Sequence, residues 1–172
     1  MIEDRPQRIL LPVRVSFMVL TTLFALLFNL LPWRDVAGLP DLLALVITFW
    51  CIHQPRRMGI GAAWALGLMM DVANGALLGQ HAFAYAVLAF GAVQLNRRIL
   101  WFGLGPQALH VLMLLVCSQL LMLAVRITAG GAFPGFAWFA GSGIAAMLWP
   151  AVTFLLLFPQ RRPEIVDVDR PI

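Results

Sequence analysis

Residues 104–126 read LGPQALHVLMLLVCSQLLMLAVR, and this stretch decides the fold class. The stretch is almost entirely apolar, and its first charged residue is Arg126. About 20 consecutive apolar residues are enough for a helix to cross the hydrocarbon core of a bilayer. The composition and length of this run therefore predict a transmembrane helix.

The whole chain has the composition of an integral membrane protein. Of its 172 residues, 62% are hydrophobic and only 12% are charged, and the mean hydropathy is +0.89. Soluble domains carry about 45–50% apolar and about 25% charged residues, so this chain has too little polar surface for a water-soluble globule. Disorder of the whole chain is excluded because it requires low hydrophobicity and high charge. All basic residues are arginines scattered between apolar runs, which argues against a nucleic-acid-binding face.

Comparable apolar runs predict six membrane-spanning helices. Prolines, glycines and paired arginines separate the runs, and each break marks a return to the membrane interface. The expected spans are 15–31, 40–53, 58–78, 82–96, 104–126 and 136–158. The predicted fold is an all-α membrane protein with a cytoplasmic N-terminal segment (1–14), a six-helix transmembrane domain (15–158) and a disordered cytoplasmic tail (159–172).

The arginines indicate the orientation of the spans. The second span, 40–53, rises only about 21 Å as a helix, so a re-entrant segment is an alternative to a crossing. With six crossings and a cytoplasmic N-terminus, ten of the twelve arginines are cytoplasmic; without the second crossing only four are. The positive-inside rule therefore favours six crossings with both termini cytoplasmic. The topology-determining pairs are Arg56, Arg57, Arg97, Arg98, Arg161 and Arg162.

Apart from Asp41 at the very start of the second span, Asp71 is the single carboxylate within a predicted span. The predicted bounds place it a few residues past the middle of the 58–78 span, where an ionised carboxylate costs about 2.5–3.5 kcal/mol on insertion scales. It is either a structural acid hydrogen-bonded to a neighbouring helix or a functional centre that contacts a ligand or a partner. Arg126 is the candidate counter-charge by depth, and His110 and Gln119 are further candidate polar partners among the helices.

Small residues recur at every fourth position through the third span. Rows of small residues let membrane helices approach closely, because packing drives their association. We therefore expect the third helix to be central and buried. Its candidate helix-packing, partner-contact or ligand-contact residues are Gly67, Asp71, Gly75 and Gly79. The Asp41 side chain, at the start of the second span, is the predicted N-cap of that helix.

No motif in the sequence indicates an enzyme, a cofactor or a metal site. No pair of carboxylates is available in one site for acid–base chemistry, and no nucleophile elbow, phosphate loop or zinc motif is present. The histidines His53, His81 and His110 fall at different predicted depths. Cys51 and Cys117 lie in apolar runs and are expected to be buried thiols.

Residues 67–82, GLMMDVANGALLGQHA, resemble the signature segment of the MreD family of bacterial rod-shape-determining membrane proteins. The turn 53–57 (HQPRR) and the approach 39–43 (LPDLL) resemble the proteobacterial form of this family. The resemblance covers about residues 8–160, although the part after residue 100 adds little beyond its predicted spans.

The resemblance implies a non-enzymatic scaffold of the cell-elongation complex in the bacterial inner membrane. It implies direct binding to MreC, a bitopic periplasmic protein. MreB, RodA and a class B penicillin-binding protein would be further partners in controlling side-wall peptidoglycan synthesis and cell shape. The family is similar in fold to the S components of energy-coupling-factor transporters, which leaves an S-component-like subunit binding a small ligand or a lipid as the alternative. The short outer loops offer little material for a lid over a ligand, which favours the scaffold.

Overall fold

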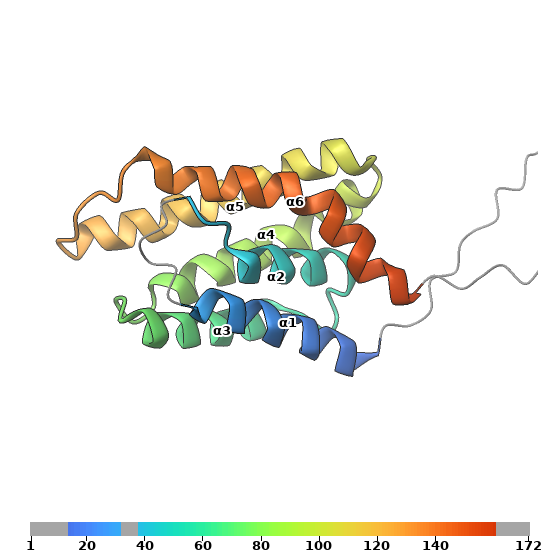
Figure 1. Ribbon diagram of the computed structural model, residues 1–172, viewed down its shortest axis with the longest axis horizontal. Helices are drawn as coiled ribbons and strands as arrows, with labels where there is room; N and C mark the ends of the chain where they lie inside the picture. The colour runs from blue at the N-terminus through green and yellow to red at the C-terminus, as the bar shows by residue number, and fades with distance from the viewer. Residues whose placement is uncertain (1–13, 32–37, 161–172) are drawn as a thin grey trace, which may run out of the picture.

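The computed structural model describes residues 14–31 and 38–160, and within these ranges every regular element is a helix. Figure 1 shows six α-helices packed side by side in an elongated bundle. They are α1 (Val15–Leu30), α2 (Leu42–His53), α3 (Ile60–Asn74), α4 (Gln80–Leu100), α5 (Leu104–Thr128) and α6 (Ala140–Leu157), with the short 3₁₀ helices η1 (Phe136–Phe139) and η2 (Phe158–Gln160) flanking α6. The predicted all-α architecture with six helices is confirmed.

Successive helices run in alternating directions, so the turns gather at two ends of the bundle (Figure 1). One end, called here the acidic end, holds Asp41, Asp71 and the loops 75–79 and 129–135. The opposite end, called here the arginine end, holds Arg56 and Arg57 before α3 and Arg97 and Arg98 in the last turn of α4. The first turn of α1 and the last turn of α6 also lie at the arginine end. Arg161 and Arg162 lie outside the described residues.

The helices differ in their capacity to cross a membrane. Two of them, Leu104–Thr128 and Phe136–Gln160, are long and apolar enough to span one by length and composition, whereas α1, α2 and α3 are apolar but shorter. Large apolar side chains point outward on all sides of the bundle; Met147 and Val72, for example, are 83% and 72% exposed. An outer surface this apolar is typical of a protein in contact with lipid.

The central helix is α2, and the prediction that the third helix is central and buried is wrong. Every residue from Leu43 to Ile52 is buried. In α3 only Ala63, Gly67, Met70 and Asp71 are buried, because its row of small residues packs mainly against one neighbour, α4, while its other faces point outward. A helix enclosed by protein need not match the thickness of the hydrocarbon core, which accounts for the shortness of α2.

The core is built around aromatic side chains of α2, α4 and α6. The indole of Trp50 packs edge-on against Phe49, and its Nε1 donates a hydrogen bond to Thr21 Oγ1 of α1 at 3.1 Å. Tyr85 and Trp149 are also fully buried. The expectation of two buried thiols is half correct: Cys51 is buried, but Cys117 is exposed on α5, because apolar runs in membrane helices include outward-facing positions.

Candidate functional site

The turn between α3 and α4 brings the Asp71 side chain next to the start of α4. Helix α3 ends at Asn74, earlier than the predicted residue 78, because Gly75 adopts a left-handed conformation with φ of 59°. The backbone N–H of Ala76 then donates to the carbonyl of Asp71 at 3.0 Å, as in a Schellman-type helix end. Gly79, with φ of 101°, is the N-cap residue immediately before α4. Asp71 therefore lies in the last turn of α3, not near the middle of a span.

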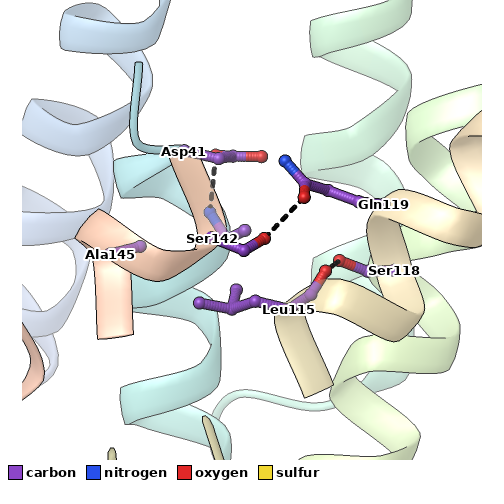
Figure 2. Close-up of a pocket in the computed structure, with 7 residues that line it drawn as sticks. Asp41, Leu115, Ser118, Gln119, Ser142 and Ala145 are labelled. Carbon is purple, nitrogen blue, oxygen red and sulfur yellow. Dashed lines mark hydrogen bonds between the residues drawn. The ribbon is translucent and has the colours of Figure 1, made fainter. Parts of the chain in front are cut away.

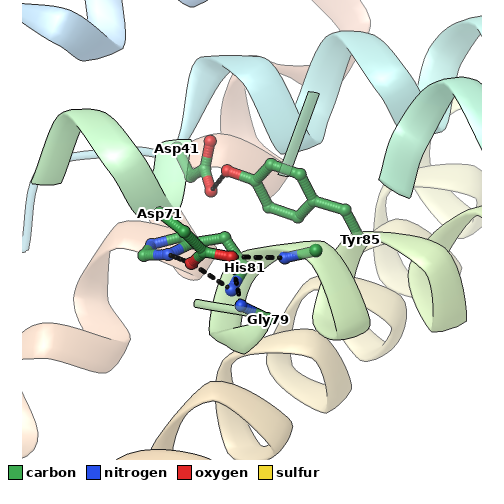
Figure 3. A network of polar contacts seen from close by, with 6 residues as sticks. Asp41, Asp71, Gly79, His81 and Tyr85 are labelled. Carbon is green, nitrogen blue, oxygen red and sulfur yellow. Dashed lines mark hydrogen bonds and ion pairs between the residues drawn. The ribbon is translucent and has the colours of Figure 1, made fainter. Parts of the chain in front are cut away.

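The Asp71 carboxylate caps the start of α4 (Figure 3). Its Oδ2 accepts hydrogen bonds from the backbone N–H of Gly79 at 2.9 Å and of Ala82 at 3.3 Å, and its Oδ1 accepts one from the N–H of His81 at 2.7 Å. The first N–H groups of a helix lack partners within that helix, and the positive end of its dipole favours a carboxylate. Asp71 thus performs for α4 the task of an N-cap residue, although it belongs to the preceding helix.

His81 provides a side-chain partner for this carboxylate. Its Nδ1 lies 2.7 Å from Asp71 Oδ1, within hydrogen-bond distance. The Asp71 side chain is fully buried, whereas that of His81 is 15% exposed. The Asp71 side chain therefore joins α3 to α4 by accepting hydrogen bonds from three backbone N–H groups at the start of α4 and by contacting the His81 imidazole.

Gly67 allows α3 and α4 to approach closely next to this cap. A Cβ atom built on Gly67 would lie 2.4 Å from Ala82 Cα and 2.6 Å from Ala82 N. Both are backbone atoms of the first turn of α4, so a side chain at residue 67 has no room unless the helices separate. This contact is the kind that a small-residue row predicts.

Gly75 and Gly79 have a different role from Gly67. A Cβ atom on either would have no neighbour within 4 Å, so neither packs against a helix within the described chain. The interpretation of these two glycines as helix-packing residues is wrong, because their positive φ angles place them in the turn. Contact of the turn with a partner or ligand stays a prediction.

Replacing Gly75 tests this distinction. We expect Gly75→Val to destabilise the protein by about 1–2 kcal/mol, because an L side chain is strained in the left-handed conformation. Asn tolerates this conformation, so Gly75→Asn should retain most of the stability. The midpoint of thermal unfolding in detergent measures both. Equal losses for the two variants would show that space around the side chain matters more than the backbone.

The predicted pairing of Asp71 with Arg126 is wrong. Arg126 is exposed near the end of α5, and the partners of Asp71 all come from the first turn of α4 or the residue before it. Donors eight to eleven residues further along the chain reach the carboxylate because the turn is short. His110 Nδ1 instead contacts the carbonyl of Pro106 in its own helix at 2.8 Å.

Gln119 joins α5 to α6, as a polar partner among the helices. Its Oε1 accepts a hydrogen bond from Ser142 Oγ at 2.7 Å (Figure 2). Its Nε2 donates to the carbonyl of Trp138 at 3.3 Å. A second link between α5 and α6, nearer the arginine end, is the hydrogen bond that Trp149 Nε1 donates to Gln107 Oε1 at 3.2 Å. Buried amides here serve helix association, which is their usual role in membrane helices.

A second carboxylate at the acidic end, Asp41, collects three hydrogen bonds. Its Oδ1 accepts from Ala44 N at 2.9 Å, which confirms Asp41 as the N-cap of α2, and from Asn29 Nδ2 at 2.7 Å. Its Oδ2 accepts from the hydroxyl of Tyr85 at 2.6 Å (Figure 3). The sequence reasoning missed the links to Asn29 and Tyr85. A signal was available, since the single tyrosine of the chain lies in an apolar run and a buried hydroxyl requires a partner.

The hydrogen bonds of Asp41 and Asp71 indicate a structural role for these carboxylates and not a catalytic one. Both carboxylates are engaged by N–H or O–H donors that link α1, α2, α3 and α4. Within the part of the chain that the structure describes, no group of three or more histidine, cysteine, aspartate or glutamate side chains is arranged to hold a metal ion.

Comparison with known proteins identifies the family. The model of a family described as rod shape-determining protein MreD matches residues 8–159. The chain belongs to the MreD family. A rod shape-determining protein MreD from Haemophilus influenzae is 32% identical over 156 residues, which cover 86% of this chain and 90% of that relative. No solved structure matches. MreD membership makes the chain a non-enzymatic membrane protein with a role in rod cell shape.

The MreD-like signature segment, residues 67–82, has a physical explanation in this fold. It contains the close contact at Gly67, the capping carboxylate of Asp71, and the turn bounded by Gly75 and Gly79. Its last residues, His81 and Ala82, supply donors to the same carboxylate. The segment therefore forms the junction between α3 and α4.

Proposed function

We propose that this chain is a non-enzymatic scaffold of the bacterial cell-elongation complex that binds MreC in the cytoplasmic membrane. Through MreC it would associate with MreB, RodA and a class B penicillin-binding protein and help to control side-wall peptidoglycan synthesis. Membership of the MreD family carries this proposal. The structure supports a scaffold because the carboxylates at the acidic end serve as links between helices.

The arginines support an orientation with the arginine end in the cytoplasm. Arg56, Arg57, Arg97 and Arg98 lie at this end together with the first turn of α1 and the last turn of α6. At the opposite end, within the described residues, lie the exposed Arg126 and the carboxylates of Asp41, which is half-buried, and Asp71, which is buried. The positive-inside rule favours an orientation with the arginine end inside, the acidic end on the outer face and both termini cytoplasmic.

The size of the polar cavity weighs against the S-component-like alternative. The cavity lined by Asp41, Ser118, Gln119 and Ser142 measures about 10 Å³, whereas sites for small organic ligands occupy about 300–1,000 Å³. A larger groove of about 370 Å³ lies between α1 and α3, but Leu30, Leu68, Met69, Val72 and Ala73 line it. None of these side chains offers a polar group that would orient a solute.

Co-purification with MreC tests the proposal. We expect the chain, solubilised in a mild detergent, to retain full-length MreC through affinity and size-exclusion steps. Mass spectrometry of the purified complex should find membrane phospholipids but no stoichiometric solute. Failure of well-folded protein to retain MreC would contradict the proposal, and a retained solute or peptidoglycan precursor would favour the ligand-binding alternative.

Two bulky replacements would locate the contact with MreC. Val72→Trp fills the groove between α1 and α3, and Met147→Trp adds a similar side chain to an outward position of α6. Both positions are largely exposed, so neither replacement should disturb the core. Loss of MreC with one variant and its retention with the other would assign the contact to that side of the bundle.

A further inference from the structure

A small polar cavity lies between α2, α5 and α6 at the acidic end (Figure 2). Its volume is about 10 Å³. The polar side chains in its wall are Asp41, Ser118, Gln119 and Ser142, and Ala44, Leu115 and Ala145 complete the lining. The cavity thus separates the Asp41 network from the Gln119–Ser142 pair.

The groups facing this cavity have unused hydrogen-bonding capacity of both kinds. A carboxylate offers about four acceptor sites, and Asp41 uses three, with only the Tyr85 hydroxyl on Oδ2. Gln119 has two N–H donors on Nε2 and uses one, at 3.3 Å to the Trp138 carbonyl. Ser118 Oγ donates to the Leu115 carbonyl at 2.8 Å, which leaves its own lone pairs available. In Figure 2 the Gln119 amide nitrogen and an Asp41 oxygen point toward one another.

We propose that this cavity is a binding site for a single water molecule that bridges Asp41 and Gln119. The water donates to Asp41 Oδ2 and to a serine hydroxyl oxygen and accepts from the Gln119 amide. Three hydrogen bonds are typical for a buried water, and about 10–15 Å³ is the smallest cavity that holds one. A metal cation fits less well, because the Gln119 N–H donor would point at it.

The bridge completes a connection across the whole acidic end. Asp41 is bonded directly to Asn29 of α1, to the first turn of α2 and to Tyr85 of α4. The water extends this network to Gln119 of α5. Because Gln119 accepts a hydrogen bond from Ser142, the network then reaches α6. The outer half of the α5–α6 hairpin is thereby joined to α2 through solvent.

Transfer of magnetisation from water to the glutamine side chains tests this proposal. The experiment uses ¹⁵N-glutamine-labelled full-length chain in lipid vesicles and solid-state NMR. Gln107 is the matched control: it is equally buried, but its Nε2 donates to the Phe102 carbonyl, its Oε1 accepts from Trp149, and it does not line the cavity. We expect transfer to the Gln119 amide to be several-fold larger than transfer to the Gln107 amide.

A variant that fills the cavity provides the second part of this experiment. Ala145→Val adds two methyl groups to the wall, and we expect it to abolish the excess transfer at Gln119 while the Gln107 signal keeps its position. Equal transfer at the two glutamines of the unaltered chain would overturn the proposal. A Gln119 chemical shift that follows the concentration of Na⁺ but not of K⁺ would overturn it too, in favour of a cation.

Discussion

Asp71→Ala is expected to lower the free energy of unfolding by about 2–4 kcal/mol. The substitution removes the acceptor of three backbone N–H groups at the start of α4 and of the His81 imidazole. The Asp71 side chain and the Ala82 N–H are buried, so this donor would have no replacement partner, and the α3–α4 joint would loosen. Unfolding of the purified protein by SDS in mixed micelles measures the loss.

Two variants control for this experiment. Val72→Ala changes the adjacent side chain, which is 72% exposed, and should alter the stability little. Asp71→Asn keeps one acceptor oxygen and should fall between Asp71→Ala and the unaltered protein. A stability of Asp71→Ala equal to that of Val72→Ala would show that the cap contributes nothing to the fold.

Gly67→Ala is expected to destabilise the protein by about 2–3 kcal/mol, even though alanine is the better helix former by about 1 kcal/mol. The added methyl group would lie 2.4 Å from Ala82 Cα, so α3 and α4 would have to separate. Separation of the helices would also lengthen the hydrogen bonds between Asp71 and α4. The same detergent unfolding measurement applies.

Gly61→Ala is the matched control because Gly61 lies in the same helix with nothing within 4 Å of its added Cβ. We expect this variant to be as stable as the unaltered chain or slightly more stable. If Gly67→Ala and Gly61→Ala had the same stability, the close contact between α3 and α4 would not exist in the membrane protein.

Hydropathy predicted the six helices because a bilayer demands long apolar runs. The starts of α1 and α5 agree with the predicted residues 15 and 104. Hydropathy could not show that α2 is the central helix, since in membrane proteins both the lipid-facing and the protein-facing side chains are apolar. Only packing distinguishes the enclosed Leu43–Ile52 segment from the outward-facing residues of the other helices.

The misinterpretation of Asp71 arose from one ambiguous pattern. Small residues at every fourth position fit a packing stripe, but a glycine after a helical run is also the usual C-cap residue. The predicted span ran to residue 78 because the apolar run continues past Gly75 and the break was placed at residue 79, which moved Asp71 toward mid-span. With Gly75 in the left-handed conformation, the helix ends and Asp71 reaches Gly79 and His81 instead of a distant arginine.

Local interactions were easier to predict than distant ones. The capping of α2 by Asp41 involves a donor three residues ahead, and the sequence signals it directly. The hydrogen bond from Tyr85 joins residues 44 positions apart, and no spacing rule connects them. The same holds for Gln119 and Ser142, whose pairing depends on how α5 and α6 are aligned.

The central claim is that Asp71 serves the fold of the scaffold and not a direct contact with the partner. The most direct measurement is the amount of MreC retained per folded copy of Asp71→Asn and of the unaltered chain, with folded protein quantified by size exclusion. We expect equal ratios, together with a lower unfolding midpoint for the variant. A variant that is as stable as the unaltered chain but no longer retains MreC would contradict this claim and place Asp71 in the partner interface.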